Sequence, residues 1–173
     1  MADILVNRIT NANIYLDGSS MLGRAEEINL PQIKHKLSEH KALGMVGATE
    51  FFAGIDKLEC KIKWTSLFAE VMKKAANPFQ AVLLQARASL ENYTGAGRTG
   101  EVPVVMTIQG TFKDFPLGNY KQHENAELET NLSVTYAKMV IAGAEIFEID
   151  VLANIYKVDG EDLLATYRAN IGG

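Results

Sequence analysis

A run of closely spaced glycines is the feature of this sequence that comes nearest to a nucleotide-binding motif. Gly95, Gly97 and Gly100 follow the order G-x-G-x-x-G within the stretch YTGAGRTGEVPVV. A dinucleotide-binding fingerprint needs a helix directly after the glycines, because the helix N-terminus binds the pyrophosphate. Residues 101–105 are instead rich in β-branched valine and include Pro103, so they predict a strand. We therefore predict a mobile hairpin loop and no phosphate-binding site.

Side chains that could bind a metal or act as a nucleophile are few and poorly spaced. His35, His40 and His123 are scattered, and no cysteine or carboxylate is placed to complete a zinc site with them. Cys60 is the only cysteine, so no internal disulfide can form, and its place on the apolar side of an alternating segment favours a small core residue over a nucleophile. We predict no catalytic residue, no metal ligand and no cofactor, and hence a protein that is not an enzyme.

The charged residues likewise favour a protein without a catalytic site. Glu145, Glu148 and Asp150 form an acidic cluster near a predicted turn, which favours a solvated or interface-facing cluster over a general acid/base pair. The net charge of −4 at pH 7 argues against a protein that grips nucleic acid, because such binding requires clustered lysine and arginine. The N-terminus lacks the pattern of a signal peptide, and no apolar window approaches the roughly 18 residues of a membrane span.

The elements that would position these residues are mostly strands. Alternating apolar and polar residues predict extended segments at 28–37, 56–64, 79–93, 101–115, 126–141 and 142–160, and Asp17-Gly18 predicts a hairpin turn. One helix is predicted over residues 65–78, and a short C-terminal helix is predicted to close on Gly172. Together these segments predict a mainly β (α+β) fold with one main helix.

Two details of the predicted helix at 65–78 can be read from the sequence. Thr65 or Ser66 is expected to cap its N-terminus. Its apolar stripe, which is expected to pack on the core, contains Phe68, Val71, Met72 and Ala75.

Several predicted strands have one apolar and one polar face. Segment 56–64 places Leu58, Cys60, Ile62 and Trp64 opposite Lys57, Glu59, Lys61 and Lys63. Segment 101–115 places Val102, Val104, Met106, Ile108 and Phe112 opposite Thr107, Gln109, Thr111 and Lys113. Segment 126–141 places Leu128, Leu132, Val134 and Tyr136 opposite Glu127, Glu129, Asn131, Ser133 and Thr135. The polar faces are typical of a solvent-exposed sheet or of the lining of a water-filled channel.

Residues 38–54 do not follow a clean period. They include Leu43, Met45, Val46, Phe51 and Phe52 together with three glycines. A long irregular loop is usually functional or disordered, and its apolar residues argue against disorder. On a monomer they would form an exposed apolar patch, so we expect a partner surface to cover them, with local packing as the alternative.

Five stretches resemble one known family in their order and spacing. They are NLPQIKHK (29–36), GMVG (44–47), GNYKQHENAE (118–127), GAEIFEIDVLANIYKVDGEDLL (143–164) and RANIG (168–172). On these stretches the chain resembles the major tail tube proteins of contractile-tailed bacteriophages, or myoviruses, and of the related R-type tailocins.

The resemblance implies a tail-tube fold: one domain over 1–173, an antiparallel β-barrel or sandwich with one flanking helix, and a long inter-ring loop at 38–54. It implies hexameric rings stacked into a hollow conduit inside a contractile sheath, for DNA passage or envelope puncture. The implied partners are further copies of the chain, the sheath protein, baseplate and tail terminator proteins, the tape measure protein and transient DNA, with no membrane in the assembled state. The implied location is the virion tail, assembled in the host cytoplasm.

On this resemblance two sets of site residues are expected. The inter-subunit loop set is Leu43, Gly44, Met45, Val46, Gly47, Phe51 and Phe52. The lumen-facing set is Glu59, Lys61, Lys63, Thr107, Gln109, Glu127 and Glu129. The alternatives are a monomeric ligand-binding β-barrel, the inner tube of another contractile injection system, and a nucleotide-dependent enzyme that uses the glycines at 95–100.

Overall fold

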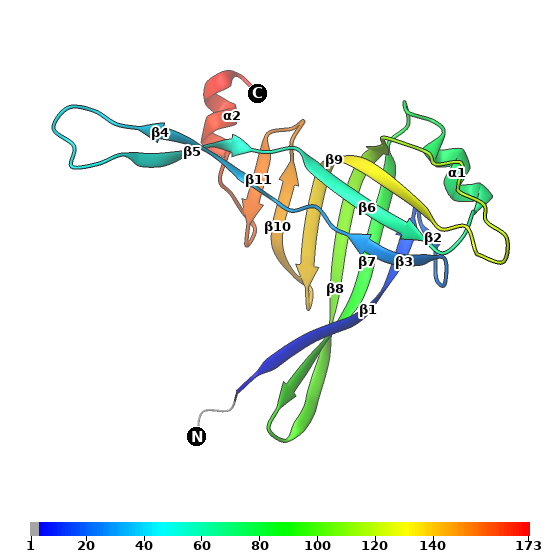
Figure 1. Cartoon of the computed structure of the whole chain (residues 1–173). Coiled ribbons are helices and arrows are strands. Elements are labelled where there is room, and N and C mark those ends of the chain that lie inside the picture. The colour runs from blue at the N-terminus through cyan, green and yellow to red at the C-terminus, as the bar shows by residue number, and fades with distance from the viewer. Residues whose placement is uncertain (1–3) are drawn as a thin grey trace.

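The computed structural model describes residues 4–173 and contains mostly antiparallel strands (Figure 1). Residues 1–3 of the expected domain lie outside the described residues. The helices are α1 (Ala69–Ala75) and α2 (Ala165–Ile171). The strands are β1 (Val6–Leu16), β2 (Ser19–Ser20), β3 (Ala25–Asn29), β4 (His35–His40), β5 (Thr49–Ile55), β6 (Leu58–Trp64), β7 (Val82–Thr94), β8 (Gly97–Phe112), β9 (Leu128–Ile141), β10 (Ala144–Asp150), β11 (Ile155–Val158) and β12 (Glu161–Asp162).

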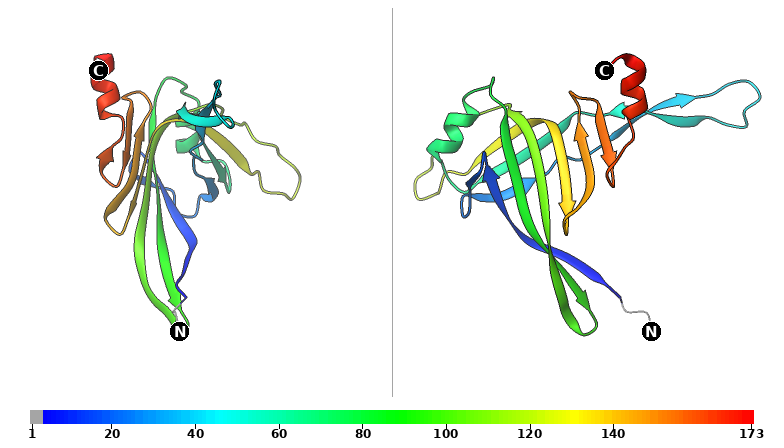
Figure 2. Two further views of the ribbon diagram at one scale, coloured as in Figure 1. Left: turned by 90° about the vertical axis from the view of Figure 1, so that its left-hand side faces the viewer. Right: turned by 180° about the vertical axis from the view of Figure 1, so that it is seen from behind.

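Ten strands form one curled sheet that folds over its own core. The strand order is β12-β11-β10-β9-β8-β7-β1-β2, and β6 branches from β9 and carries β3 on its far edge. The β3–β6 layer therefore lies across the β7–β10 layer, as the side view in Figure 2 shows. Buried side chains of both layers, such as Trp64, Leu84 and Ile108, meet between them. In the described part of the chain β1 and β3 do not pair, so the fold is an open sandwich and not a closed barrel.

The alternation in segment 56–64 is confirmed. Leu58, Cys60, Ile62 and Trp64 are all buried in β6, and the residues between them face outward. The same holds for β8, where the buried positions include Val104, Met106, Ile108 and Phe112.

The face predicted for Tyr136 is wrong, because a β-bulge interrupts β9. The pairing of β8 with β9 shifts register between Gln109 and Gly110, and Thr135 is left as the extra residue. Ala137 is therefore buried in place of Tyr136. The bulge lies where β9 exchanges β6 for β10 as its neighbour, so it marks the corner at which one layer turns into the other.

A glycine is required beside this corner. A Cβ atom at Gly110 would lie 2.2 Å from the carbonyl oxygen of Ser133. No other residue fits there without moving the β8–β9 backbones apart. The close approach of the two strands therefore depends on the glycine at this one position.

The turn predictions are partly confirmed. Asp17 and Gly18 form the tight turn after β1, both with positive φ, as a type I′ turn requires. The glycine stretch also lies in a hairpin, between β7 and β8, but it is not an extended loop. Thr94 and Gly97 still pair, so only Gly95 and Ala96 remain as a two-residue turn.

Both predicted helices are present, and one predicted cap is wrong. α1 begins after Phe68, which makes no side-chain capping bond, and the Thr65 hydroxyl instead donates to the Arg24 carbonyl oxygen. Val71 and Ala75 are buried as expected. α2 ends at Gly172 with φ of 82°, the left-handed C-cap that the sequence predicts.

Candidate assembly surfaces

A two-stranded arm projects from the body of the molecule (Figure 1). β4 and β5 pair only with each other, from His35–Ile55 at the root to His40–Thr49 near the tip. The prediction of an irregular loop at 38–54 is wrong, because most of that segment is this hairpin. The predicted single strand at 28–37 is likewise divided, since β3 ends at Asn29 before Pro31 and β4 begins at His35.

The tip of the arm, residues 41–48, exposes its large apolar side chains, two of them completely. Leu43 is 105% and Val46 is 111% exposed, so neither side chain is covered by its own chain. Met45 is also exposed. The alternative of local packing is therefore wrong for the tip. Free backbone edges along β4 and β5 add unpaired donors and acceptors to this surface.

Phe51 and Phe52 lie away from the tip. The Phe52 ring packs edge-on against His35, with ring centroids 5.5 Å apart, and also faces Tyr156 of β11 at 6.5 Å. The His35 Nε2 atom lies 3.0 Å from the Tyr156 hydroxyl oxygen, at hydrogen-bonding distance. The root of the arm is thus held to β11 by an aromatic contact and a hydrogen bond, whereas the tip is free.

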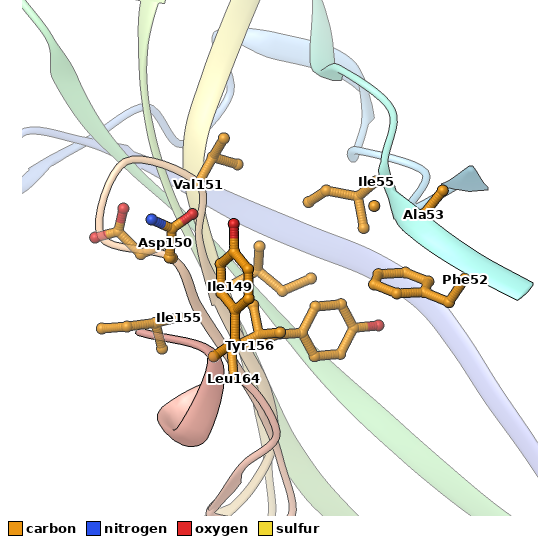
Figure 3. A pocket seen from close by; sticks show the side chains of 12 residues that line it. Phe52, Ala53, Ile55, Ile149, Asp150, Val151, Ile155, Tyr156 and Leu164 are labelled. Carbon is orange, nitrogen blue, oxygen red and sulfur yellow. The ribbon is translucent and has the colours of Figure 1, made fainter. Parts of the chain in front are cut away.

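An apolar pocket of about 480 Å³ opens beside this root (Figure 3). Its walls come from the end of β5, from the β10–β11 hairpin and from α2, and they include Ile55, Ile149 and Tyr156. The Asp150 carboxylate already accepts backbone hydrogen bonds from Leu152 and Ala153, both at 3.0 Å. The pocket is therefore mainly apolar, and its one carboxylate already has backbone hydrogen-bond partners.

The lumen-facing set predicted from alternation divides into two groups. Glu59, Lys61, Lys63, Glu127 and Glu129 come together on the outer face of the β3–β6 layer and the first half of β9. There Lys61 lies 2.8 Å from Glu129, and Lys63 lies 2.9 Å from Glu127. The hydrogen bonds that the Lys63 ammonium donates to Glu127 and to Glu26 raise its pKa above the usual value.

Thr107 and Gln109 lie on the other layer. Both are on the outer face of β8, next to Gln85 of β7 and Tyr136 of β9. Because the inner faces of β6 and β8 enclose the same core, their outer faces point in opposite directions (Figure 2). Alternation along single strands could not reveal this, since it does not tell which strand belongs to which layer.

The polar face of the β7–β10 layer contains functional candidates that the predicted set omitted. Lys138 lies 2.6 Å from Glu145, and Lys157 lies 2.8 Å from Glu148. The Lys157 hydrogen bond lowers the pKa of Glu148. Burial, followed by the hydrogen bond to Glu148, raises the pKa of Tyr136 to about 12. The acidic cluster near 145–150 is thus an ion-paired surface, and the alternation of 126–141 would have placed Lys138 there once the bulge was known.

The described residues give little support to metal or thiol chemistry. Residues 4–173 contain no group of three or more His, Cys, Asp and Glu side chains placed to hold a metal ion. Burial raises the pKa of the Cys60 thiol to about 12, which keeps it protonated and unreactive. Within the same residues, no helix has both the length and the apolar character needed to cross a membrane.

The whole chain exposes more surface than a compact monomer of its size. A monomer of 19.0 kDa is expected to expose about 8,400 Å². This chain exposes 11309 Å², an excess of about 2,900 Å² over that expectation. A standard interface covers only about 800 Å² per partner. The open sheet edges, the free apolar tip and this excess indicate a structural protein that assembles with other chains.

Comparison with known proteins identifies the family. Residues 6–172 match the family model described as phage tail tube protein FII. The chain is 32% identical over 166 residues to the tail tube protein of Escherichia phage P2, covering 92% of this chain and 94% of that protein. It is 27% identical over 152 residues to the major tail tube protein of Serratia phage KSP20, covering 87% and 86%. The chain therefore belongs to the phage tail tube protein FII family, and it is a structural component of the virion tail.

Proposed function

We propose that six copies of this chain form a ring and that rings stack into a hollow conduit inside a contractile sheath. The excess of exposed surface carries this proposal, because it is large enough for several interfaces on each copy. The open edges of the sheet support it further. The strand order ends at β12 with no further strand beside it among the described residues, so this edge is available to a neighbouring copy.

The outer face of the β7–β10 layer is the better candidate for the lumen. It ends in the available edge of β12, and it contains the long strands β7 and β8. It places Thr107 and Gln109 toward the cargo, together with the Lys138–Glu145 ion pair. The group around Lys61 and Glu129 then faces outward, where the sheath protein is expected.

The charge of this face suits a conduit for DNA. Duplex DNA carries one charge per roughly 1.7 Å of its axis and binds basic surfaces strongly. Lysines that are already paired, such as Lys138 and Lys157, are poor phosphate ligands. At physiological salt the remaining fields decay over about 8 Å, so they act only near the wall. The same balanced lining serves a tube that punctures an envelope.

Tape measure, baseplate and tail terminator proteins would contact the lumen and the two ends of such a tube. The arm is the element proposed to reach the adjoining ring, through Leu43, Gly44, Met45, Val46 and Gly47. Phe51 and Phe52 are proposed to support it from the root. Exposed aliphatic side chains at the tip of a projecting hairpin are the form expected of a contact made between subunits.

Negative-stain electron microscopy of the purified chain over a concentration series tests the proposal, with light scattering to measure mass. The expected result is hollow rods with sixfold end views that increase with concentration. A monodisperse monomer at every concentration would contradict the proposal and favour the monomeric ligand-binding alternative. Saturable binding of an apolar dye to that monomer would then be the next measurement.

A further inference from the structure

A second groove lies at the end of the molecule opposite the arm. It has a volume of about 620 Å³ and lies between β1 on one side and β2–β3 on the other. Figure 1 and the rear view in Figure 2 both place β2 and β3 far from the arm. The arm and the groove are thus different surfaces at opposite ends of one chain.

The groove is bordered by unpaired strand edges. Residues 6–13 of β1 pair only with β7, and β3 pairs only with β6. Within the described residues neither edge has a strand on its groove side. The side-chain oxygen of Asn13, which lines the groove, is buried without a hydrogen-bond partner. Such edges accept an extended or hairpin segment from another chain.

The apolar and acidic side chains of the groove complement the arm tip. Ile9, Leu22 and Ile28 supply apolar surface, and Leu22 is 75% exposed. Glu26 and Glu27 are the charged residues among those that line the groove. The tip, residues 41–48, has exposed aliphatic side chains and a single charge, that of Lys41. An apolar tip with one cation therefore meets a groove that is apolar and polar in similar measure, with Glu27 on its rim beside Glu26, which is paired with Lys63.

We propose that the groove between β1 and β3 receives the arm tip of a second copy of this chain. The inference rests on the proposed function and names the acceptor of the arm. β4 has six residues, so at about 3.3 Å per residue the tip lies roughly 20 Å beyond the root. Because the arm and the groove are different patches, the contact is heterologous, and it propagates from copy to copy as a tube requires.

Disulfide cross-linking of assembled protein tests the contact. The double variant L22C/L43C carries one thiol in the groove and one at the tip, while the native Cys60 is buried and does not compete. Oxidation of its tubes is expected to give a ladder of covalent multimers on a non-reducing gel. The matched control L43C/V151C carries its second thiol in the pocket at the arm root and is expected to stay monomeric on the gel.

A charge exchange gives a second readout that needs no cysteine. K41E places two acids together, and it is expected to raise the concentration needed for half-assembly by about tenfold. Adding E27K is expected to return that concentration to near the wild-type value. Both positions are exposed in the single chain, so neither change should prevent folding.

The outcomes separate the two proposals. Tubes of L22C/L43C without a ladder, or a ladder in L43C/V151C instead, would overturn the groove as acceptor and leave the tube intact. K41E without effect, or without rescue by E27K, would overturn it as well. If the wild-type chain makes no rings or tubes, the proposed function fails, and the inference fails with it.

Discussion

Removal of the arm separates folding from assembly more sharply than any single substitution. In the variant, residues 37–53 are replaced by Asn-Gly, a two-residue turn that joins Lys36 to Gly54. These two residues lie opposite each other in the hairpin, so the new turn closes a register that already exists. Lys36 can keep its ion pair with Asp56, at 3.6 Å in the intact chain.

The structure predicts a small cost in folding stability. The removed segment contributes no buried core residue, and its main contact with the body is that of Phe52 with His35 and Tyr156. Aromatic pairs of this kind contribute about 0.5–1.5 kcal/mol each. Shortening the connection offsets part of that loss. The free energy of unfolding should therefore fall by about 1–2 kcal/mol, a minor part of the roughly 5–15 kcal/mol typical of a domain.

Urea denaturation followed by tryptophan fluorescence measures this cost. Trp64 is the only tryptophan and is 1% exposed, so it reports directly on the core. Sedimentation and electron microscopy measure assembly on the same samples. The variant is expected to unfold cooperatively near the wild-type midpoint and to form no tubes.

The control for the arm removal is F52A, which keeps the tip and loses only the contact at the root. It should show a stability loss similar to that of the deletion and should still form tubes, although at a higher protein concentration because the root of the arm is held less firmly. An unfolded deletion variant would show that the arm belongs to the folding core. Normal tubes from the deletion variant would refute the assignment of the arm to assembly.

Three further predictions concern the body of the molecule. T130V should lower the free energy of unfolding by about 1–3 kcal/mol in urea denaturation, because it leaves the buried Trp64 indole N–H without its acceptor at 2.9 Å. G110A should lower the melting temperature, since an added Cβ overpacks the β8–β9 corner at a cost of about 1–3 kcal/mol. E148Q should weaken the loss of folding stability at acid pH. The lowered pKa of Glu148 means that its bond to Lys157 stabilises the fold above about pH 4.5, and that this contribution is lost as the pH falls through the pKa of the folded state. Urea midpoints measured between neutral pH and about pH 3 test this.

Each of these has a matched control or a contrary outcome. T111V makes the same substitution on the outer face of β8 and should change the free energy of unfolding by no more than about 0.5 kcal/mol. An equal loss in T130V and T111V would refute the role of the buried hydrogen bond. An unchanged melting temperature in G110A would show that the corner can relax. If the stability of E148Q falls as steeply at acid pH as that of the wild type, the pH dependence belongs to other carboxylates.

Much of the local structure could be predicted because it depends on neighbours in the chain. The strict alternation of β6 placed Cys60 and Trp64 in the core. Asp17-Gly18 predicted a turn and Gly172 predicted a helix end, because few other residues tolerate positive φ. The absence of a helix after Gly100 was enough to reject a dinucleotide site. The family resemblance was also readable from the sequence, and the comparisons confirmed it.

The arm shows where such reasoning stops. Its residues have no clean period because neither face of the hairpin is buried against the body, so no apolar alternation marks β4 and β5 as strands. The register of a two-stranded arm is set by the pairing between its strands and by its turn. The spacing of apolar residues along one strand cannot reveal either. Leu43 and Val46 were nevertheless singled out by residue type, and both are exposed, while their place in a contact between subunits stays a prediction.

The sequence by itself determined the class of fold, the faces of most strands, the family and the apolar tip, because each of these follows from residue type and from spacing along one segment. Only the tertiary structure decided that the β9 bulge moves Ala137 into the core in place of Tyr136, and that Lys61 and Thr107 lie on opposite layers. It alone placed the arm and the β1–β3 groove at opposite ends. These features depend on which strands become neighbours, and pairing between distant segments is set by the packing of the whole core.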